Sequence, residues 1–316
     1  MRSSTAAGSR LQGSPRQGRF AALLVATCVA LAAACGGGGG GSTKPDLGGV
    51  AFGNGVFVAV SSIGQSHVSS SGNQDWAVYD VGVADGLSAV AHGAGRFVAV
   101  GDGGAIATSA DGVTWDLPSS PTTAALGGIG HGAGLFVAVG EGGTILTSPN
   151  GSAWTVRSSG TNATLEGVVR ARDAFFVVGD AGTILRSADG ATWSRVASGV
   201  EANLNGIASR DSVLVVAGDA GTLLVSRDDG KAWEIRSTDL ELNLVSAFWA
   251  QGTFVVGGEK GTLVTSIEAR EWLLRETQTK QILQSIAYGN GFFVTVGTAS
   301  DGLVSIDAVS WLKVKI

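Results

Sequence analysis

The chain has 316 residues, of which 44% are apolar, 50 are glycine and only five are proline. This composition excludes a disordered chain, because it supplies enough apolar material for a large core, and it disfavours long helices, because glycine is a poor helix former. The formal net charge of −5 argues against nucleic acid as a partner. An all-β fold is the class that these numbers favour.

The first 35 residues form a separate unit. Four arginines and no acidic residue precede an apolar run from Phe20 to Ala34, and Cys35 follows it. A basic segment before a short apolar run is the pattern of a secretory signal peptide. The run is shorter than the roughly 20 residues that a membrane-spanning helix needs. The sequence therefore predicts export.

The end of this unit, "LAAAC" followed by "GGGGGGSTKPD", resembles a bacterial lipoprotein signal. The resemblance implies that Cys35 becomes the lipidated first residue and that residues 36–46 form a flexible tether. Leu31 lies four residues before the cysteine, where the family pattern usually places it three before. The alternative is cleavage at an Ala-x-Ala site with Cys35 incidental, which would leave an unpaired thiol in an oxidising compartment. By resemblance to lipoprotein sorting rules, Gly36 points to the outer membrane.

Lipidation at Cys35 would discard Cys28, so no disulfide could form and packing alone would hold the fold. The loss of four arginines would leave 17 basic and 26 acidic residues, a net charge of −9. This balance again argues against a nucleic-acid partner.

Residues 47–316 repeat themselves seven times. A leucine recurs every 39 or 40 residues, at Leu47, Leu87, Leu126, Leu165, Leu204, Leu244 and Leu283. Each unit also has one tryptophan near its end, at Trp76, Trp115, Trp154, Trp193, Trp233, Trp272 and Trp311. A unit contains four short strand patterns, such as "LSAVAHG", "RFVAVG", "AIATS" and "TWDLP", separated by glycine or acidic turns. Seven units of four strands predict a seven-bladed β-propeller.

Two further columns of the repeat support this fold. The second strand begins with phenylalanine in six units and with Leu214 in one, which predicts one bulky core residue per blade. Two places after each leading leucine the residue is always small, as expected where inner strands crowd around an axis. One segment argues locally against the pattern. Residues 267–282 have a helix-prone composition, but Trp272 keeps the repeat phase, so we expect a strand there.

The stretch "SADGVTW" recurs between the third and fourth strands as "SPNGSAW", "SADGATW" and "SRDDGKAW". It resembles the Asp-box, or BNR repeat, of sialidase-type and photosystem II assembly-factor-like propellers. In that family these boxes are turns that lie away from the catalytic face. The resemblance implies that the polar residue of each box accepts backbone N–H bonds, at Asp111, Asn150, Asp189 and Asp228.

No familiar catalytic motif or three-histidine metal site is found, so no cofactor is expected. A sialidase-like enzyme would need an arginine triad, a tyrosine nucleophile and an acid. The chain has only Tyr79 and Tyr288, and residues 47–86 contain no arginine. Five units place an acid in the turn after the second strand, at Asp102, Glu141, Asp180, Asp219 and Glu259. Tight-turn chemistry explains these acids better than a cation site does.

The position five residues after each leading leucine changes from unit to unit. It holds Phe52, His92, His131, Arg170, Ser209, Trp249 and Tyr288. Such residues often anchor interfaces, and we expect them around one mouth of the propeller channel. The alternative is that they serve packing alone.

These observations favour a non-catalytic, lipid-anchored propeller of the cell envelope that acts as a binding or assembly scaffold for protein or glycan. A glycan-active, sialidase-like hydrolase and a purely structural surface protein remain the alternatives.

Overall fold

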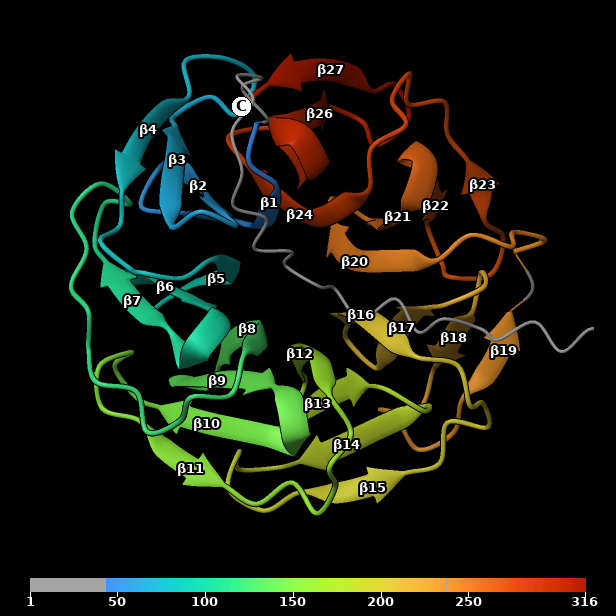
Figure 1. Ribbon diagram of the computed structural model, residues 1–316. Helices are drawn as coiled ribbons and strands as arrows, with labels where there is room; N and C mark the ends of the chain where they lie inside the picture. Colours follow the sequence, from blue (N-terminus) through green and yellow to red (C-terminus); the bar gives the residue numbers. More distant parts are fainter. Residues whose placement is uncertain (1–43, 237) are drawn as a thin grey trace, which may run out of the picture. The chain divides into compact units, whose positions relative to one another are not determined.

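The computed structural model describes residues 44–236 and 238–316. The expected signal peptide, Cys35 and most of the expected tether lie outside these residues. The described chain forms seven antiparallel sheets arranged in a ring, which confirms the seven-bladed β-propeller (Figure 1). We number the blades 1 to 7 in chain order. Within the described residues, no helix has the length and hydropathy needed to cross a bilayer.

The strands follow the repeat units. Blade 1 contains β1 (Leu47–Gly53), β2 (Val56–Ser61), β3 (Gln65–Ser69) and β4 (Ala77–Asp80). Blade 2 contains β5 (Leu87–Gly93), β6 (Arg96–Gly101) and β7 (Ile106–Ser109). Blade 3 contains β8 (Leu126–Gly132), β9 (Leu135–Gly140), β10 (Thr144–Ser148) and β11 (Thr155–Arg157). Blade 4 contains β12 (Leu165–Ala171), β13 (Ala174–Gly179), β14 (Thr183–Ser187) and β15 (Ser194–Val196).

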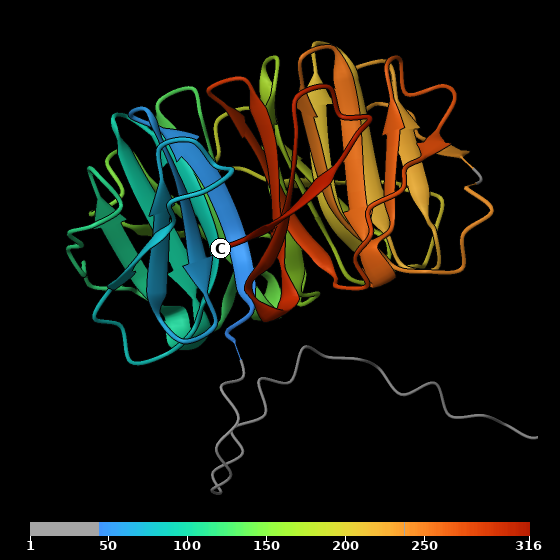
Figure 2. The same cartoon turned by 90° about the horizontal axis from the view of Figure 1, so that it is seen from above.

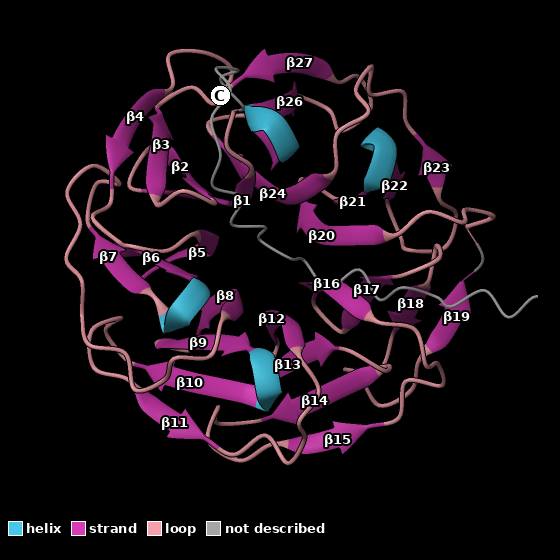
Figure 3. Cartoon of the chain, viewed as in Figure 1, coloured by secondary structure: helices cyan, strands magenta, loops and turns pink. Residues whose placement is uncertain are grey.

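The last three blades keep the same order. Blade 5 contains β16 (Leu204–Arg210), β17 (Val213–Gly218), β18 (Leu223–Ser226) and β19 (Glu234–Arg236). Blade 6 contains β20 (Leu244–Ala250), β21 (Thr253–Gly258), β22 (Leu263–Ser266) and β23 (Leu273–Leu274). Blade 7 contains β24 (Leu283–Gly289), β25 (Phe292–Gly297), β26 (Asp301–Ser305) and β27 (Leu312–Lys315). Four short 3-10 turns, η1 (Asp102–Gly104), η2 (Glu141–Gly143), η3 (Glu259–Gly261) and η4 (Thr298–Ser300), follow second strands (Figure 3).

Blade 2 departs from the four-strand pattern. Its expected fourth strand is reduced to a single bridge between Thr108 and Asp116. Pro118 follows two residues later, and proline has no N–H to continue a strand ladder. The sequence pattern is therefore right about the path of the chain but overstates its hydrogen bonding.

The segment 267–282 also differs in detail from the expectation. It contains no helix, and only Leu273–Leu274 pair with β22 as a strand. The remainder is turn and irregular chain. Leu273 lies opposite Thr265, so the repeat phase is kept.

The small residue two places after each leading leucine lies at a β-bulge. In all seven blades the register of the innermost strand shifts between these two positions. A Cβ added at Gly128 would lie 2.4 Å from the carbonyl oxygen of Glu166 in the next blade. Inner strands therefore approach too closely for larger side chains, which confirms the steric reason for the column.

The core consists of layers of apolar side chains between neighbouring blades, which stand side by side around the ring (Figure 2). The bulky residue of each second strand packs toward the preceding blade. Phe136 of blade 3 contacts a cluster that includes Val98 and Val100 of blade 2, and Phe57 of blade 1 packs with Val294 of blade 7. These phenylalanines are almost wholly buried.

Closure of the ring joins blades 1 and 7 without an exchanged strand. β1 packs against β24, and residues just before β1 contact the η4 turn. The Ser300 hydroxyl donates to the Pro45 carbonyl at 2.7 Å, and the Ala299 N–H donates to the Asp46 carboxylate at 2.8 Å. Packing of the first blade on the last, reinforced by residues 44–46, therefore closes the propeller.

Candidate functional site

The variable position of the repeat lies at the end of the innermost strands. We call Phe52, His92, His131, Arg170, Ser209, Trp249 and Tyr288 the mouth ring. Strand register places each directly opposite the residue that begins the second-strand core, for example His92 opposite Phe97 and Arg170 opposite Phe175. All seven members are half-buried. One mouth of the propeller thus presents six types of side chain from seven blades on a uniform frame.

Each aromatic or basic member of the mouth ring rests on the core residue opposite to it. The ring centroids of His131 and Phe136 are 4.5 Å apart, and those of Tyr288 and Phe293 are 4.8 Å apart. The Arg170 guanidinium lies 4.8 Å from the Phe175 ring centroid, a cation–π geometry. The core phenylalanines therefore pack against one side of these mouth-ring residues. The packing alternative explains the contacts on that side.

Glycines in the neighbouring blades form seats for four of these side chains. A Cβ added at Gly53 would lie 2.0 Å from His92 Cγ, and one added at Gly93 would lie 2.1 Å from His131 Cγ. Gly132 stands in the same relation to Arg170, and Gly289 to Phe52. None of these glycines has a positive φ, so close approach is the reason for them. The glycine column, which ends the innermost strand, was the sequence signal for these seats, and our sequence analysis missed it.

For Trp249 of blade 6, the seat position in blade 5 holds a cation instead of a glycine. Arg210 ends β16, and its guanidinium lies 5.5 Å from the Trp249 ring centroid. Arg210 is not evident as a site residue from the sequence, because the column in which it stands is otherwise glycine or alanine. Trp249 and Arg210 together place a cation and a large aromatic surface at this mouth.

Several polar groups of the mouth ring are either buried or hydrogen-bonded to the protein backbone. Nε2 of His92 and Nε2 of His131 are buried without a hydrogen-bond partner among the described residues. Burial lowers the pKa of both imidazoles, and the neighbouring His131 lowers that of His92 further. Arg170 Nη1 donates to the Ala188 carbonyl at 3.2 Å, and the Ser209 hydroxyl donates to the Arg170 carbonyl at 3.1 Å. Both histidines are therefore biased toward the neutral form.

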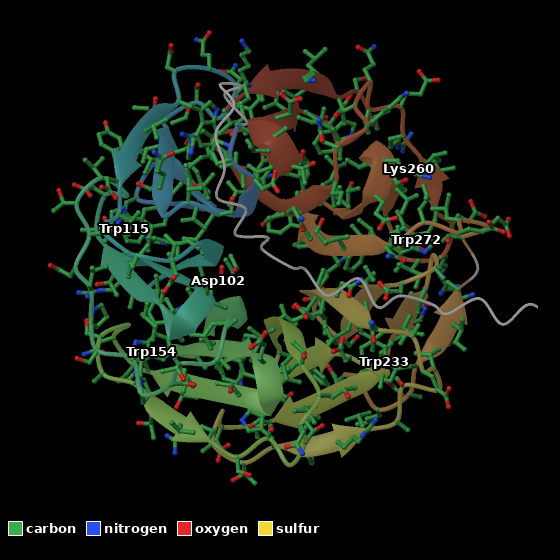
Figure 4. The ribbon with its side chains drawn as sticks, in the orientation of Figure 1. Asp102, Trp115, Trp154, Trp233, Lys260 and Trp272 are labelled. Carbon is green, nitrogen blue, oxygen red and sulfur yellow. The ribbon has the colours of Figure 1, made fainter. Side chains whose placement is uncertain are left out.

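The opposite mouth is acidic. The five predicted turn acids lie there, and Glu166 of β12, which sequence analysis missed, lies among them. The pKa of Glu166 is raised mainly by burial and further by the negative charges of Asp180, Glu141 and Asp219. Figure 4 shows Asp102 at the inner end of blade 2. The pKa of Asp102 is raised mainly by burial and further by the negative charges of Asp85 and Glu141.

Local turn chemistry accounts for part of this acidic mouth. Asn203 and Asn205 donate to the Asp219 carboxylate at 3.1 and 2.9 Å, and Asn243 donates to Glu259 at 3.1 Å. Within residues 44–236 and 238–316, no group of three or more potential metal ligands is assembled. The two mouths therefore differ in chemistry, one carboxylate-rich and the other aromatic and basic.

The "SADGVTW" stretches form turns on the same side as the mouth ring. The Asp111 carboxylate accepts the Val113 and Thr114 N–H groups at 2.8 and 2.9 Å. These hydrogen bonds lower the pKa of Asp111, and the bond from the Thr114 N–H has the largest effect. Equivalent bonds are made by Asn150, Asp189, Asp228 and Asp307. The Trp115 indole donates to the Gly112 carbonyl at 3.0 Å.

Asp307 makes this turn although its sequence, "SIDAVSW", lacks the glycine. Ala308 adopts the positive φ of 58° that glycine supplies elsewhere. The repeat tryptophans lie toward the rim, where Figure 4 labels Trp115, Trp154, Trp233 and Trp272. Trp115, Trp154 and Trp233 each pack on a cluster formed by residues of two neighbouring blades. Each turn thus pins one blade to its neighbour.

A sialidase-like site would need one of the chain's two tyrosines beside an arginine triad and an acid. Tyr79 lies in β4, the outermost strand of blade 1, whereas Tyr288 lies in the innermost strand of blade 7. Arg170 lies in β12 of blade 4, and its guanidinium is engaged with Phe175 and the Ala188 carbonyl. The geometry therefore offers no specific support for the hydrolase alternative.

Comparisons with known proteins agree with the fold. Residues 135–248 match the model of the DUF6242 β-propeller domain. No curated protein sequence matches the chain. Among solved structures, YCF48 bound to D1 peptide has a TM-score of 0.67 at 14% identity, covering 82% of this chain and 92% of that one. YCF48 from Cyanidioschyzon merolae has a TM-score of 0.65 at 14% identity, covering 82% and 94%.

A WD40 propeller is similar to the same degree. The WD40 β-propeller domain of Doa1 has a TM-score of 0.66 at 13% identity, covering 82% of this chain and 91% of that one. Identities this low establish the shared fold alone. The chain is a seven-bladed β-propeller with an aromatic and basic mouth ring at one end and a carboxylate-rich mouth at the other.

Proposed function

We propose that this protein is a non-catalytic scaffold of the bacterial cell envelope that binds a protein partner at the mouth ring. The observation that carries the proposal is the mouth ring itself. A repeat that keeps its core leucine, phenylalanine and tryptophan nearly constant carries six different residue types among its seven blades at this supported, half-buried position. Aromatic and arginine side chains on a rigid frame are the residues that contribute most to protein interfaces.

Two further points support this proposal. The solved YCF48 propeller is described as bound to D1 peptide, so a similar fold accommodates a peptide. The mouth ring lies on the same side as the "SADGVTW" turns, the side that the family resemblance keeps away from catalysis. A protein segment is therefore the partner class that we favour over a glycan.

The binding proposal predicts that a ring variant loses its partner. A chain carrying His92→Ala, Arg170→Ala, Trp249→Ala and Tyr288→Ala should retain less than about one tenth of the cross-linked partner, because removal of interface anchors costs more than 1.4 kcal/mol in total. In-cell cross-linking followed by mass spectrometry measures the captured proteins. Arg195→Ala, on the exposed outer strand β15, serves as the control and should capture the wild-type set.

Folding of the ring variant is checked separately by circular dichroism and thermal unfolding. Capture of the same partners by the folded ring variant would contradict the proposal, and the mouth ring would then be a packing feature. Glycan arrays probed with the same two proteins distinguish a sugar ligand from a protein partner.

We also propose that Cys35 carries a lipid and tethers the propeller to the outer membrane. Cys35→Ser should move the protein from the membrane fraction to the soluble fraction and remove the acyl mass from its N-terminal peptide. Cell fractionation and mass spectrometry of that peptide measure both effects, with Cys28→Ser as the control. An unmodified N-terminal peptide beginning after an Ala-x-Ala site would contradict this tether.

A further inference from the structure

Large apolar side chains are exposed mainly on the last two blades. Among the described residues, eleven such side chains are exposed, and six of them belong to blades 6 and 7. We call these six the apolar wall: Ile267, Leu273, Leu274, Ile306, Val309 and Leu312. Their exposed fractions run from 47% for Val309 to 71% for Ile306. Figure 1 shows β23 and β27 as the outer strands of these two adjacent blades.

The repeat provides an internal control for this surface. The residue after the serine that ends the third strand is Ile267 in blade 6 and Ile306 in blade 7. In blades 1 to 5 the same position holds Ser70, Ala110, Pro149, Ala188 and Arg227. Five blades therefore fold without a large aliphatic side chain at this position.

A second position shows the same change. The residue after the repeat tryptophan is Leu273 in blade 6 and Leu312 in blade 7. In blades 1 to 5 it is Ala77, Asp116, Thr155, Ser194 and Glu234, all of them exposed. Because blade folding does not require leucine there, the paired change in blades 6 and 7 needs a reason outside the blade.

The apolar wall has a groove and a ridge. Ile267 and Leu273 of blade 6 line a groove of about 430 Å³ together with Val309 of blade 7. Ile306 and Leu312 of blade 7 do not line it and are exposed to 71% and 70%, and we call these two side chains the ridge. One molecule thus carries both a groove with apolar lining residues and highly exposed apolar side chains on adjacent blades.

Charges around the groove are of both signs. Arg270 and Arg275 line it together with Glu268, Glu271 and Asp307. A bilayer surface with anionic lipids favours a basic rim, which this groove lacks. A two-fold symmetric contact, by contrast, requires one surface that carries both members of each complementary pair.

We propose that the apolar wall is a homodimer interface, in which the ridge of one copy enters the groove of the other. Leu312 of one copy packs against Ile267 and Leu273 of its mate, and the two-fold axis repeats the contact. The basic and acidic groups around one groove face their opposites around the other. No mouth-ring residue belongs to the apolar wall or lines the groove, so the dimer leaves both mouth rings outside the contact.

Light scattering on the purified full-length protein in detergent tests the dimer over a range of concentrations. We expect a dimer that the double variant Leu273→Ser, Leu312→Ser converts to a monomer, with the dissociation constant raised at least tenfold. The matched control, Ile63→Ser with Val156→Ser, removes side chains of comparable exposure, 59% and 57%, from other blades and should remain dimeric. A monomer at every concentration, or a dimer that survives the double variant, would overturn the proposal.

A cross-linking experiment tests the geometry without relying on dissociation. Protein with Ile267→Cys is mixed with protein with Leu312→Cys, both in a Cys28→Ser, Cys35→Ser background, and treated with a short bismaleimide. Groove-to-ridge packing predicts a mixed cross-linked dimer, whereas Ile63→Cys mixed with Val156→Cys should give none. Equal yields from both mixtures, or association of the apolar wall with lipid vesicles in place of a second copy, would overturn the dimer.

Discussion

Phe136→Ala is expected to lower the free energy of unfolding by about 3–5 kcal/mol. Phe136 is fully buried between blades 2 and 3, where it contacts Val98 and Leu146, and it also supports His131 of the mouth ring. Removal of its ring leaves a cavity in a layer that extends between two sheets, and neither sheet can collapse without moving its other contacts. Denaturant unfolding measures the change.

The repeat supplies the controls for this variant. Phe136→Leu should cost about 1 kcal/mol, because Leu214 occupies the same position in blade 5. Val156→Ala, at a side chain that is 57% exposed in the same blade, should change stability by less than about 0.5 kcal/mol. If Phe136→Ala were as mild as Val156→Ala, the layer between the blades would not be the stabilising core.

His67→Leu is expected to raise the free energy of unfolding by about 1–3 kcal/mol. His67 is only 3% exposed, and neither of its ring nitrogens has a hydrogen-bond partner among the described residues. It lies opposite Ala59, which packs with Val294 and Val296, so it faces blade 7 across the closure of the ring. The other six blades hold an aliphatic residue at this position: Ala107, Leu146, Leu185, Leu224, Val264 and Leu303.

The gain from His67→Leu should increase at acid pH. Burial lowers the pKa of His67, so below about pH 6.5 the unfolded chain binds a proton that the folded chain excludes. Wild-type stability therefore falls as the pH drops through this range, and the leucine variant falls less steeply. His92 and His131 also have lowered pKa values, so a residual slope remains.

Thermal unfolding at pH 8 and pH 5.5 measures both effects. His67→Gln keeps a polar side chain without a partner and should show no stabilisation at pH 8. A leucine variant less stable than wild type would mean that the imidazole makes a favourable contact in the closure layer.

The repeat makes much of the candidate site predictable from the sequence alone. The phase of Leu126 and Phe136 places His131 at the end of an inner strand, because side chains alternate along strands and the units are self-similar. The glycine seats were missed since a glycine in one blade acts on a side chain of the next. Glu166 was missed for the same reason: its carboxylate neighbours come from three blades.

The sequence by itself determined the number of blades, the order of strands and the identity of the mouth ring, because each depends on periodicity within the chain. Only the tertiary structure decided that the mouth ring and the "SADGVTW" turns lie on the same side of the propeller. It likewise decided how residues 44–46 close the ring and that the His67 imidazole is buried without a hydrogen-bond partner among the described residues. It also decided that Leu273, Leu274 and Leu312 stay exposed, whereas leucines such as Leu146 are buried. The physical reason is that burial and hydrogen bonding here arise between blades, across distances in sequence that no local pattern records.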